Sequence, residues 1–352
     1  MKENIPQLKW RCIGKSVEGA SHKHFGLPNQ DAIRWFPESG IGPPVILAVS
    51  DGHGSAKSFR SDRGSRFAVE TAIRVIREFF LSSQTSYVNF SALKDATERL
   101  LPQRLVNEWR KVVNEDLGLS ENDQEKLTNK PNFTDEEKQI LVQKDGESAW
   151  QAVENNIFLA YGATLLAVLV TESFIVYIQL GDGDILEVDY KVNTTRTLER
   201  DPNLIANETT SLCMNKAWNK IQVHVELYPK GTPKEMPALI LVSTDGYSNS
   251  FSTDEGFFKI GQDYRQMFKS NLTEEVRQKL QGFLEETSEK GSGDDITLGM
   301  IKRLEIDDRD YLSDCIGDLG RVVKGTKESV MKQNEPPKNT SEQSSFNRRL
   351  TP

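Results

Sequence analysis

The chain has 352 residues, a formal net charge of −8 at pH 7, 37% hydrophobic residues and 27% charged residues. This composition excludes a collagen-like chain and a disulfide framework. The longest aliphatic run, residues 165–170, is far shorter than the roughly 18 residues that a membrane-spanning helix needs. Because an acidic chain repels nucleic acid, we expect no nucleic-acid partner. The short apolar runs likewise predict no membrane partner. Wherever this acidic chain handles an anion, we expect bound cations.

The cysteine pattern indicates a reducing compartment. Cys12, Cys213 and Cys315 are widely spaced and form no C-x-x-C pair. Such a pattern favours three free thiols and argues against a zinc site. The first residues also lack the apolar segment of a secretory signal. The sequence therefore predicts a cytoplasmic protein.

The first half of the chain reads as strands followed by helices. Short segments bounded by Gly, Pro and Asn predict strands at residues 8–17, 32–36 and 45–50. Apolar residues at spacings of three and four predict a helix over 55–80. A second helix is expected over 91–117, broken or kinked at Pro102. Residues 118–148 are polar and aperiodic, and we interpret them as an insertion or a long loop.

The second half returns to strands. The predicted strands cover residues 163–170, 174–180, 185–190, 221–227, 238–243 and 296–302, with a helix over 272–288. Consecutive strands lie too close together for parallel crossovers, which need about a dozen residues. We therefore predict an α+β fold of largely antiparallel sheets with helices outside. A polar tail is expected over 304–352, disordered from about residue 331.

Two segments share one pattern, an aliphatic strand that ends in a small hydroxyl residue and continues as Asp-Gly. They lead into Asp51-Gly52-His53-Gly54 and Asp245-Gly246. Such a strand places a carboxylate at the rim of a sheet, and the glycine lets the backbone approach a ligand closely. Asp31 and Asp294 stand at comparable junctions. A single Asp-Gly is more often a β-turn, but carboxylates gathered in this way suit Mg²⁺ or Mn²⁺ rather than zinc.

In this order the motifs resemble those of the metal-dependent type 2C protein serine/threonine phosphatases. The matching residues are Asn29-Gln30-Asp31, Asp51-Gly52-His53-Gly54, Gly162-Ala163-Thr164, Gly181-Asp182, Asp245-Gly246 and Asp294-Asp295-Ile296-Thr297. The Gln-Asp form of the first motif resembles the bacterial branch. The resemblance implies a catalytic domain over residues 1–303, folded as a four-layer α-β-β-α sandwich of two largely antiparallel sheets flanked by helices.

The resemblance also implies a site for two Mn²⁺ or Mg²⁺ ions. Asp51 would bridge both ions, and the carbonyl of Gly52 would complete one coordination shell. Asp245 and Asp294 would hold the other ion, and Asp31 would act through bound water. The ions would activate a water that hydrolyses phosphoserine or phosphothreonine in proteins, with no covalent enzyme intermediate.

Roles for two further residues and an expectation about partners follow from the same resemblance. His53 would protonate the departing Ser or Thr oxygen, and the alternative is a histidine in a solvated loop without a catalytic role. Asp182 would serve a third ion. That ion would bind more weakly, because Asn249 stands where the family often has a second aspartate for it. As partners we expect phosphorylated proteins together with a cognate serine/threonine kinase, and we expect a monomer.

One position departs from the family in a way that affects substrate binding. Gly26 stands where many members carry an arginine that grips the substrate phosphate. The nearby basic residues are His22, Lys23 and His24. They are the first candidates for a replacement, and the alternatives are a solvated turn with no role, or an arginine such as Arg60 or Arg63.

Two other functions remain open at the level of sequence. Asp182-Gly-Asp184 after a strand imitates a haloacid-dehalogenase-like phosphatase, which would form an aspartyl phosphate on Asp182. That fold needs helical crossovers after its nucleophile strand, whereas residues 185–228 read as strands and turns. The other is a catalytically silent module with the phosphatase fold, but such a module should have lost some of the metal carboxylates.

Overall fold

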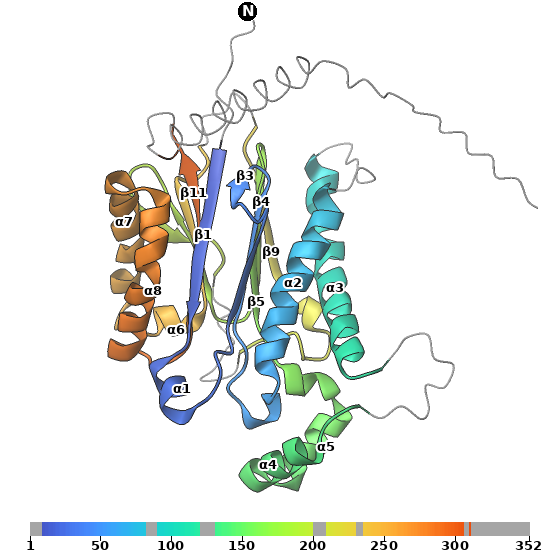
Figure 1. Ribbon diagram of the computed structural model, residues 1–352. Coiled ribbons are helices and arrows are strands. Elements are labelled where there is room, and N and C mark those ends of the chain that lie inside the picture. Colours follow the sequence, from blue (N-terminus) through green and yellow to red (C-terminus); the bar gives the residue numbers. More distant parts are fainter. Residues whose placement is uncertain are drawn as a thin grey trace, which may run out of the picture. The chain divides into compact units, whose positions relative to one another are not determined.

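The computed structural model describes residues 9–81, 90–119, 131–199, 209–229, 235–305 and 310. The chain divides into two units, Met1–Glu305 and Ile306–Pro352. All the helices and strands below belong to the first unit (Figure 1). The predicted tail was to begin at residue 304, but Leu304 still belongs to strand β11 (Ile296–Leu304). Apart from Leu304, Glu305 and Asp310 the tail lies outside the described residues, as does its expected disorder from about residue 331.

Two antiparallel sheets form the centre of the molecule. The six-stranded sheet has the order β3-β1-β11-β10-β7-β8, and the five-stranded sheet has the order β2-β4-β5-β6-β9. The strands are β1 (Lys9–Val17), β2 (Ala32–Phe36), β3 (Ile41–Gly42), β4 (Val45–Ser50), β5 (Leu165–Val170), β6 (Phe174–Leu180), β7 (Asp184–Val188), β8 (Thr194–Arg196), β9 (Gln222–Leu227), β10 (Leu239–Ser243) and β11 (Ile296–Leu304). This arrangement confirms the predicted α+β class with antiparallel sheets.

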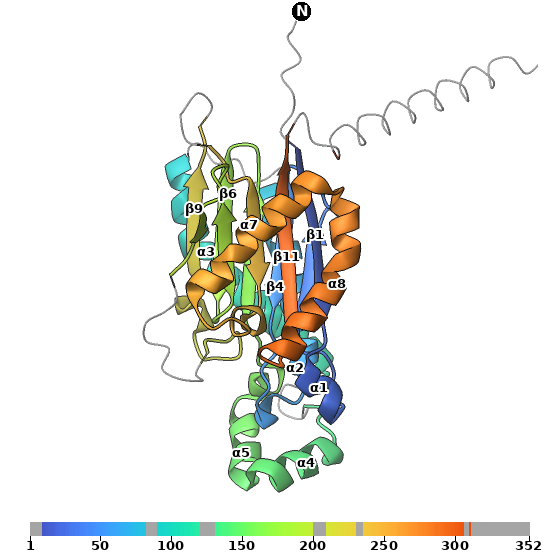
Figure 2. The same cartoon turned by 90° about the vertical axis from the view of Figure 1, so that its left-hand side faces the viewer.

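Helices cover the outer faces of both sheets (Figures 1 and 2). The α-helices are α1 (Ala20–Phe25), α2 (Ser61–Leu81), α3 (Phe90–Asp116), α4 (Asp135–Asp145), α5 (Glu147–Asn155), α6 (Asp245–Ser248), α7 (Asp254–Ser270) and α8 (Thr273–Lys290). Three short 3₁₀ helices are η1 (Ala56–Ser58), η2 (Ile157–Tyr161) and η3 (Ala217–Asn219). In Figure 1, α2 and α3 lie beside the five-stranded sheet, and α7 and α8 lie beside the six-stranded sheet.

Three hydrophobic layers hold the four structural layers together. Alternation along β4 sends Ile46 and Ala48 against α2 and α3, and sends Leu47 and Val49 between the two sheets. On the other side, Leu186 of β7 packs with side chains of α7 and α8. The core therefore has the layering of the predicted α-β-β-α sandwich, and it is confirmed as one.

Helix α3 corrects one expectation about its proline. The helix runs without interruption through Pro102, which is buried together with Leu101 and Leu105. A proline inside a helix removes one hydrogen bond and costs about 3 kcal/mol. Burial of the flanking side chains offsets that cost, so the predicted break does not occur.

The polar stretch 118–148 also differs from the expected loop. Residues 120–130 lie outside the described residues, but Asp135–Asp145 form helix α4. The helix begins with a capping box, in which the Thr134 side chain accepts from the Glu137 backbone and the Glu137 carboxylate accepts from the Thr134 backbone. The helix is mostly polar with one fully buried apolar residue, Leu141, so periodicity gave no signal.

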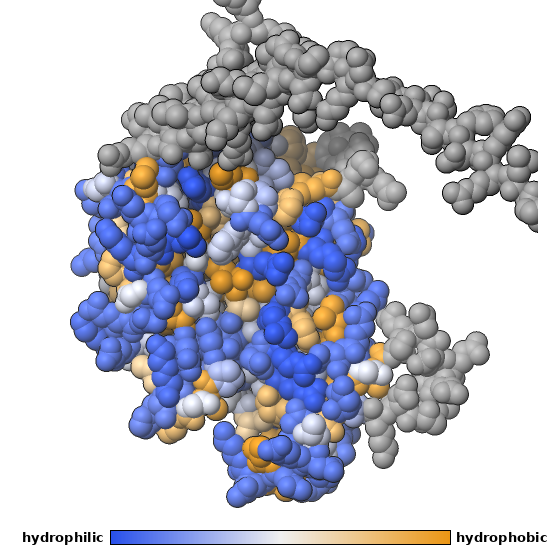
Figure 3. All heavy atoms as spheres, in the orientation of Figure 1, coloured by the Kyte–Doolittle hydropathy of each residue, from blue (hydrophilic) through white to orange (hydrophobic). Residues whose placement is uncertain are grey.

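The surface seen in Figure 3 is largely hydrophilic, with smaller hydrophobic areas between. Among the described residues, none of the helices combines the length and the apolar character needed to cross a membrane. Cys12 and Cys213 are buried free thiols, as expected, and Cys315 lies outside the described residues.

Candidate active site

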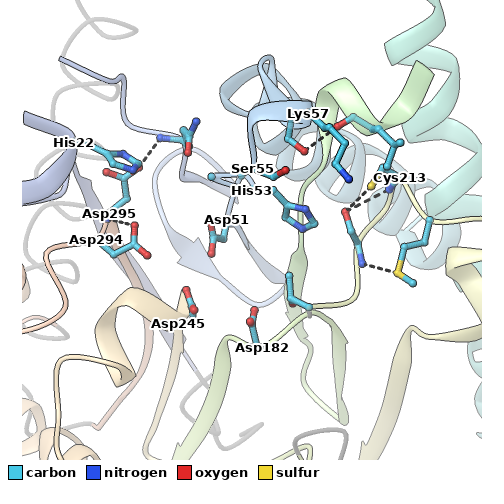
Figure 4. Close-up of a pocket in the computed structure, with 18 of the residues that line it drawn as sticks. His22, Asp51, His53, Ser55, Lys57, Asp182, Cys213, Asp245, Asp294 and Asp295 are labelled. Atoms are coloured by element: carbon cyan, nitrogen blue, oxygen red, sulfur yellow. Dashed lines mark hydrogen bonds and ion pairs between the residues drawn. The ribbon is translucent and has the colours of Figure 1, made fainter. Parts of the chain in front are cut away.

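The site lies where strands of both sheets end. Asp51 follows β4 of the five-stranded sheet, and Asp245 follows β10 of the six-stranded sheet. Asp294 precedes β11, which runs antiparallel to β10. These ends line one cleft of about 1140 Å³, shown in Figure 4. The two Asp-Gly segments, which are almost 200 residues apart in the sequence, therefore meet at one rim.

Three carboxylates converge at the floor of this cleft. Asp51, Asp182 and Asp245 each place one oxygen within 4.8 Å of the other two, and Figure 4 shows them directed toward one another. Asp294 lines the same cleft but lies outside this group of three. Asp31 does not line the cleft, but it reaches the same rim through Thr244, whose hydroxyl donates to Asp31 Oδ2 at 2.7 Å.

The negative charges of these carboxylates repel one another. Burial raises the pKa of Asp51 well above its usual value, and the negative charges of Asp31 and Asp245 raise it further. Burial likewise raises the pKa of Asp31, and it raises the pKa of Asp245 to about 6. Carboxyl groups in this arrangement resist joint ionisation unless positive charge is brought among them.

The donor set matches a hard divalent cation. The cluster offers carboxylate oxygens that follow three strands, β4, β6 and β10, with no cysteine sulfur among them. Asp31 Oδ1 is buried and has no hydrogen-bond partner among the described residues. Oxygen ligands of this kind suit Mg²⁺ and Mn²⁺, so the residues present fit the metal that the sequence predicts.

The glycines of both Asp-Gly motifs serve the chain itself. A Cβ atom on Gly52 would lie 2.6 Å from the Gln30 carbonyl oxygen and 2.7 Å from that of Ser61. A Cβ atom on Gly246 would lie 2.1 Å from the Asp295 carbonyl oxygen. These glycines were expected to let a ligand approach closely, whereas here they let neighbouring backbone segments pack against the rim of the sheets.

His53 lies beside the carboxylate cluster. Its backbone N–H donates to the Gly162 carbonyl at 3.0 Å, and its Nε2 is buried without a partner among the described residues. Burial lowers the pKa of His53, and the negative charge of Asp182 partly opposes this shift. The imidazole therefore faces the cleft with one ring nitrogen available for a ligand.

The predicted basic cluster separates into one residue in the cleft and two outside it. His22 lines the cleft, and its Nδ1 lies 3.0 Å from Asp295 Oδ2. Lys23 is half exposed and pairs with Glu285 at 3.6 Å, and His24 contacts Phe25 edge to face. Neither Lys23 nor His24 lines the cleft, because successive positions of α1 point in different directions.

Asp295 joins three segments around the rim. One carboxylate oxygen accepts from the Gly19 N–H at 2.6 Å, and the other accepts from the Gln30 N–H at 2.6 Å. Asp295 is 3% exposed and its pKa is raised, with burial as the largest cause. The sequence quoted it only as part of a motif, and it proves to hold the start of α1 and the approach to Asp31 together.

A second group that the sequence missed lies behind η1. We call it the arginine cluster, and it consists of Arg60, Arg63, Asp116, Glu137 and Tyr161. Arg60 donates to both Glu137 oxygens, at 2.6 and 2.9 Å, and to the Tyr161 hydroxyl at 2.7 Å. Asp116 pairs with Arg63 and accepts from Tyr161. Both arginines were possible phosphate ligands, and both have acidic partners within the protein.

Lys57 and Cys213 also line the cleft without having been singled out. Lys57 follows the Asp51-Gly52-His53-Gly54 motif by three residues, so its spacing alone was a signal. Cys213 comes from a segment far along the chain, and no sequence motif placed it in the cleft. Asn249, expected near the third ion, donates to Asp245 Oδ2 at 2.9 Å.

The two-sheet sandwich with a rim of carboxylates defines a metal-dependent hydrolase site. A protein-family model described as protein phosphatase 2C matches residues 18–285. The chain therefore belongs to the protein phosphatase 2C family, and it is a metal-dependent protein serine/threonine phosphatase. A comparison with curated protein sequences finds no match.

Solved structures of bacterial phosphatases are similar to the chain at low identity. The catalytic domain of PstP from Mycobacterium tuberculosis, in complex with two manganese ions, has 14% identity, covers 85% of this chain and 100% of that one, and gives a TM-score of 0.45. The S. agalactiae serine/threonine phosphatase has 15% identity, coverages of 83% of this chain and 99% of that one, and a TM-score of 0.47. PppA of Pseudomonas aeruginosa has 15% identity, coverages of 84% and 98%, and a TM-score of 0.48.

The haloacid-dehalogenase alternative does not fit this fold. Asp182 is followed at once by strands β7 and β8, which pair with each other antiparallel. The helical crossover that such an enzyme needs after its nucleophile strand is therefore replaced by a hairpin.

Proposed function

We propose that the acidic cleft is the catalytic centre, and that it holds two Mn²⁺ or Mg²⁺ ions with room for a weaker third. The ligands would be Asp51, Asp245 and Asp294, the carbonyl of Gly52 and, through water, Asp31, with Asp182 at the third ion. When bound, the ions would supply a water of lowered pKa and would offset the charge of the phosphoryl oxygens. The convergence of Asp51, Asp182 and Asp245 within 4.8 Å carries this proposal.

The remaining residues orient these ligands and move a proton. Thr244 fixes Asp31 by donating to Oδ2, and Asn249 fixes Asp245 in the same way. His53 would donate a proton to the oxygen of the departing serine or threonine, from the Nε2 that has no partner among the described residues. A bound phosphate dianion beside the ring would favour its protonated form and oppose the effect of burial.

The proposed substrates are phosphoserine and phosphothreonine in proteins, opposed in the cell by a cognate serine/threonine kinase. A role in cytoplasmic signalling as a monomer completes the proposal. The carboxylates that a silent module should have lost are all present in the sequence, so no observation favours that alternative.

Manganese-dependent hydrolysis of a small aryl phosphate tests the proposed function. We expect activity with added Mn²⁺ that is lost in chelator and in the Asp51→Asn variant. The matched control is Asp95→Asn, because Asp95 is a 63% exposed residue on α3 far along the chain from the motifs. A wild-type protein that binds Mn²⁺ but hydrolyses neither aryl phosphate nor phosphopeptide would support the silent module instead.

A further inference from the structure

The cleft contains one permanent positive charge among many negative ones. Its lining includes the aspartates Asp51, Asp182, Asp245, Asp294 and Asp295. Among the lining residues that the structure describes, the one lysine or arginine is Lys57. The metal ions of the proposed function would offset the charge of the aspartates at the carboxylate cluster, so outside that cluster the place of this one side-chain cation bears on which substrates can bind.

The other basic groups near the cleft are already engaged. The ion pairs are His22–Asp295, Arg60–Glu137 and Arg63–Asp116. The buried Nε2 of His53 faces the cleft beside the carboxylate cluster, and the proposed function uses it at the leaving oxygen. Lys57 differs from all of these, because no ion pair of the described residues includes it.

The backbone that carries Lys57 is firmly held. It lies in η1, where the Ser58 N–H donates to the Ser55 carbonyl at 2.8 Å and the Ser58 hydroxyl donates to the Leu159 carbonyl at 2.8 Å. Two residues further on, the Arg60 N–H donates to the Ala160 carbonyl at 2.8 Å. Lys57 is half-buried. Its ammonium group is therefore presented from a fixed wall rather than from a free loop.

Figure 4 places Lys57 on the far side of His53 from the carboxylate cluster. In the proposed function the phosphoryl group binds at that cluster and the leaving oxygen faces His53. The part of the substrate that reaches Lys57 is then the peptide beside the phosphorylated residue, rather than the phosphoryl group itself. An ammonium group at this place attracts a carboxylate.

We propose that Lys57 is a specificity residue that selects phosphopeptides with an aspartate or glutamate next to the phosphorylated residue. This inference rests on the proposed function, because it needs a substrate phosphoryl group at the carboxylate cluster. It assigns no chemical step to Lys57. The side chain contributes to binding of one class of substrate and discriminates against others.

Paired phosphopeptides test the proposal. Each pair has the same sequence apart from aspartate or asparagine within two residues of the phosphothreonine, on its N-terminal or its C-terminal side. The measured quantity is the ratio of kcat/KM for the aspartate peptide to that for the asparagine peptide, with Mn²⁺ present. We expect wild type to favour the aspartate peptide about fivefold on at least one side, as a single partly exposed ion pair allows.

Charge variants at Lys57 should then move this ratio in order. Lys57→Arg should keep the preference, Lys57→Gln should bring the ratio close to one, and Lys57→Glu should invert it. Lys259→Gln is the matched control, since Lys259 is an exposed residue of α7 on the other helical layer, and it should retain the wild-type ratio. Added salt should weaken the wild-type preference, because exposed charges are screened over about 8 Å at physiological ionic strength.

The outcomes separate this inference from the proposed function. A ratio that is the same in wild type and Lys57→Gln would overturn the role of Lys57 while leaving the phosphatase in place. An equal loss of kcat/KM in Lys57→Gln on aryl phosphate and on both peptides would also overturn it, because Lys57 would then act at the phosphoryl group. Absence of any Mn²⁺-dependent hydrolysis by wild type would overturn both.

Discussion

The carboxylate floor of the cleft and the arginine cluster behind η1 use buried charge in opposite ways. In the arginine cluster each charge has its counterpart, as Arg60 has in Glu137 and Arg63 has in Asp116. At the floor, Asp51 faces Asp245 and Asp182 with no cation among the described groups. Paired charges of the first kind hold a fold together, whereas opposed charges of the second kind lower its stability until a ligand arrives.

Substitution at Asp51 should show the largest effect and should separate activity from stability. Asp51→Asn removes the central negative charge, so we expect turnover of aryl phosphate to fall more than tenfold, a barrier increase above about 1.4 kcal/mol. In chelator the same change should raise the thermal midpoint, because it relieves repulsion from Asp31 and Asp245. Retention of more than about a tenth of wild-type turnover would contradict the role of Asp51 as the bridging ligand.

Bound Mn²⁺ should offset the repulsion among the carboxylates at the floor of the cleft and so stabilise the fold. Mn²⁺ at one hundred times its dissociation constant should stabilise wild type by about 2.7 kcal/mol. Asp245→Asn should lose most of this gain, and Asp95→Asn should keep it. The measurement is the thermal midpoint with and without Mn²⁺, followed by denaturant titration. An equal Mn²⁺ shift in wild type and Asp245→Asn would place the ion elsewhere.

Substitution at Arg60 should lower the stability of the fold, whereas substitution at Asp51 should raise it in chelator. Arg60→Met leaves Glu137 without its partner, and breaking a buried pair costs about 3–5 kcal/mol. Because the Glu137 side chain is 24% exposed, we expect a smaller loss of about 2 kcal/mol in the free energy of unfolding. Arg99→Met is the control, since Arg99 is 69% exposed. Loss of less than about 0.5 kcal/mol would mean that the cluster does not stabilise the fold.

The pH dependence of this pair has a definite sign. Burial raises the pKa of Glu137, but hydrogen bonds from Arg60 and Thr134 outweigh it and the net shift is downward. A carboxyl group with a lowered folded pKa contributes stability above its unfolded pKa of about 4.3 and loses it as pH falls through the folded value. The stability difference between wild type and Glu137→Gln should therefore be constant near neutral pH and shrink below about pH 4.

The same contrast explains what the sequence could predict. Asp51 and Asp245 could be recognised because each follows a short, continuous apolar run, which is a local sequence pattern. The arginine cluster could not be recognised because its members come from the turn before α2, α2 itself, the end of α3, α4 and η2, and meet only in the folded chain. Helix α4 was missed for a related reason, since its apolar side is too small to produce periodicity.

The basic residues of the cleft were located less well from the sequence than its carboxylates. The run His22-Lys23-His24 was selected by charge and by nearness to Asp31 in the sequence. Only the fold shows that His22 alone turns toward the cleft. Lys57 was not singled out, although it follows His53 by only four residues.

A smaller effect is expected at His53, and it depends on the substrate. His53→Gln removes the proposed proton donor but keeps the fold, because the backbone contact to Gly162 does not need the imidazole. Loss of a general acid matters most for a poor leaving group such as serine. We therefore expect kcat to fall several-fold more on a phosphoserine peptide than on an aryl phosphate. Equal losses on the two substrates would remove His53 from this role.

The smallest effects are expected at α1, whose charged residues belong neither to the carboxylate floor of the cleft nor to the arginine cluster. The side chains of Lys23 and Glu285 are 49% and 40% exposed, and such pairs contribute about 0–1 kcal/mol. Lys23→Ala should therefore leave the unfolding free energy and the KM for phosphopeptides nearly unchanged. His22→Ala should raise that KM several-fold, since it removes a cleft residue held by Asp295 and so loosens the segment that leads to Asp31. If Lys23→Ala proved the more damaging of the two, α1 would have to turn a different face to the cleft when substrate is bound.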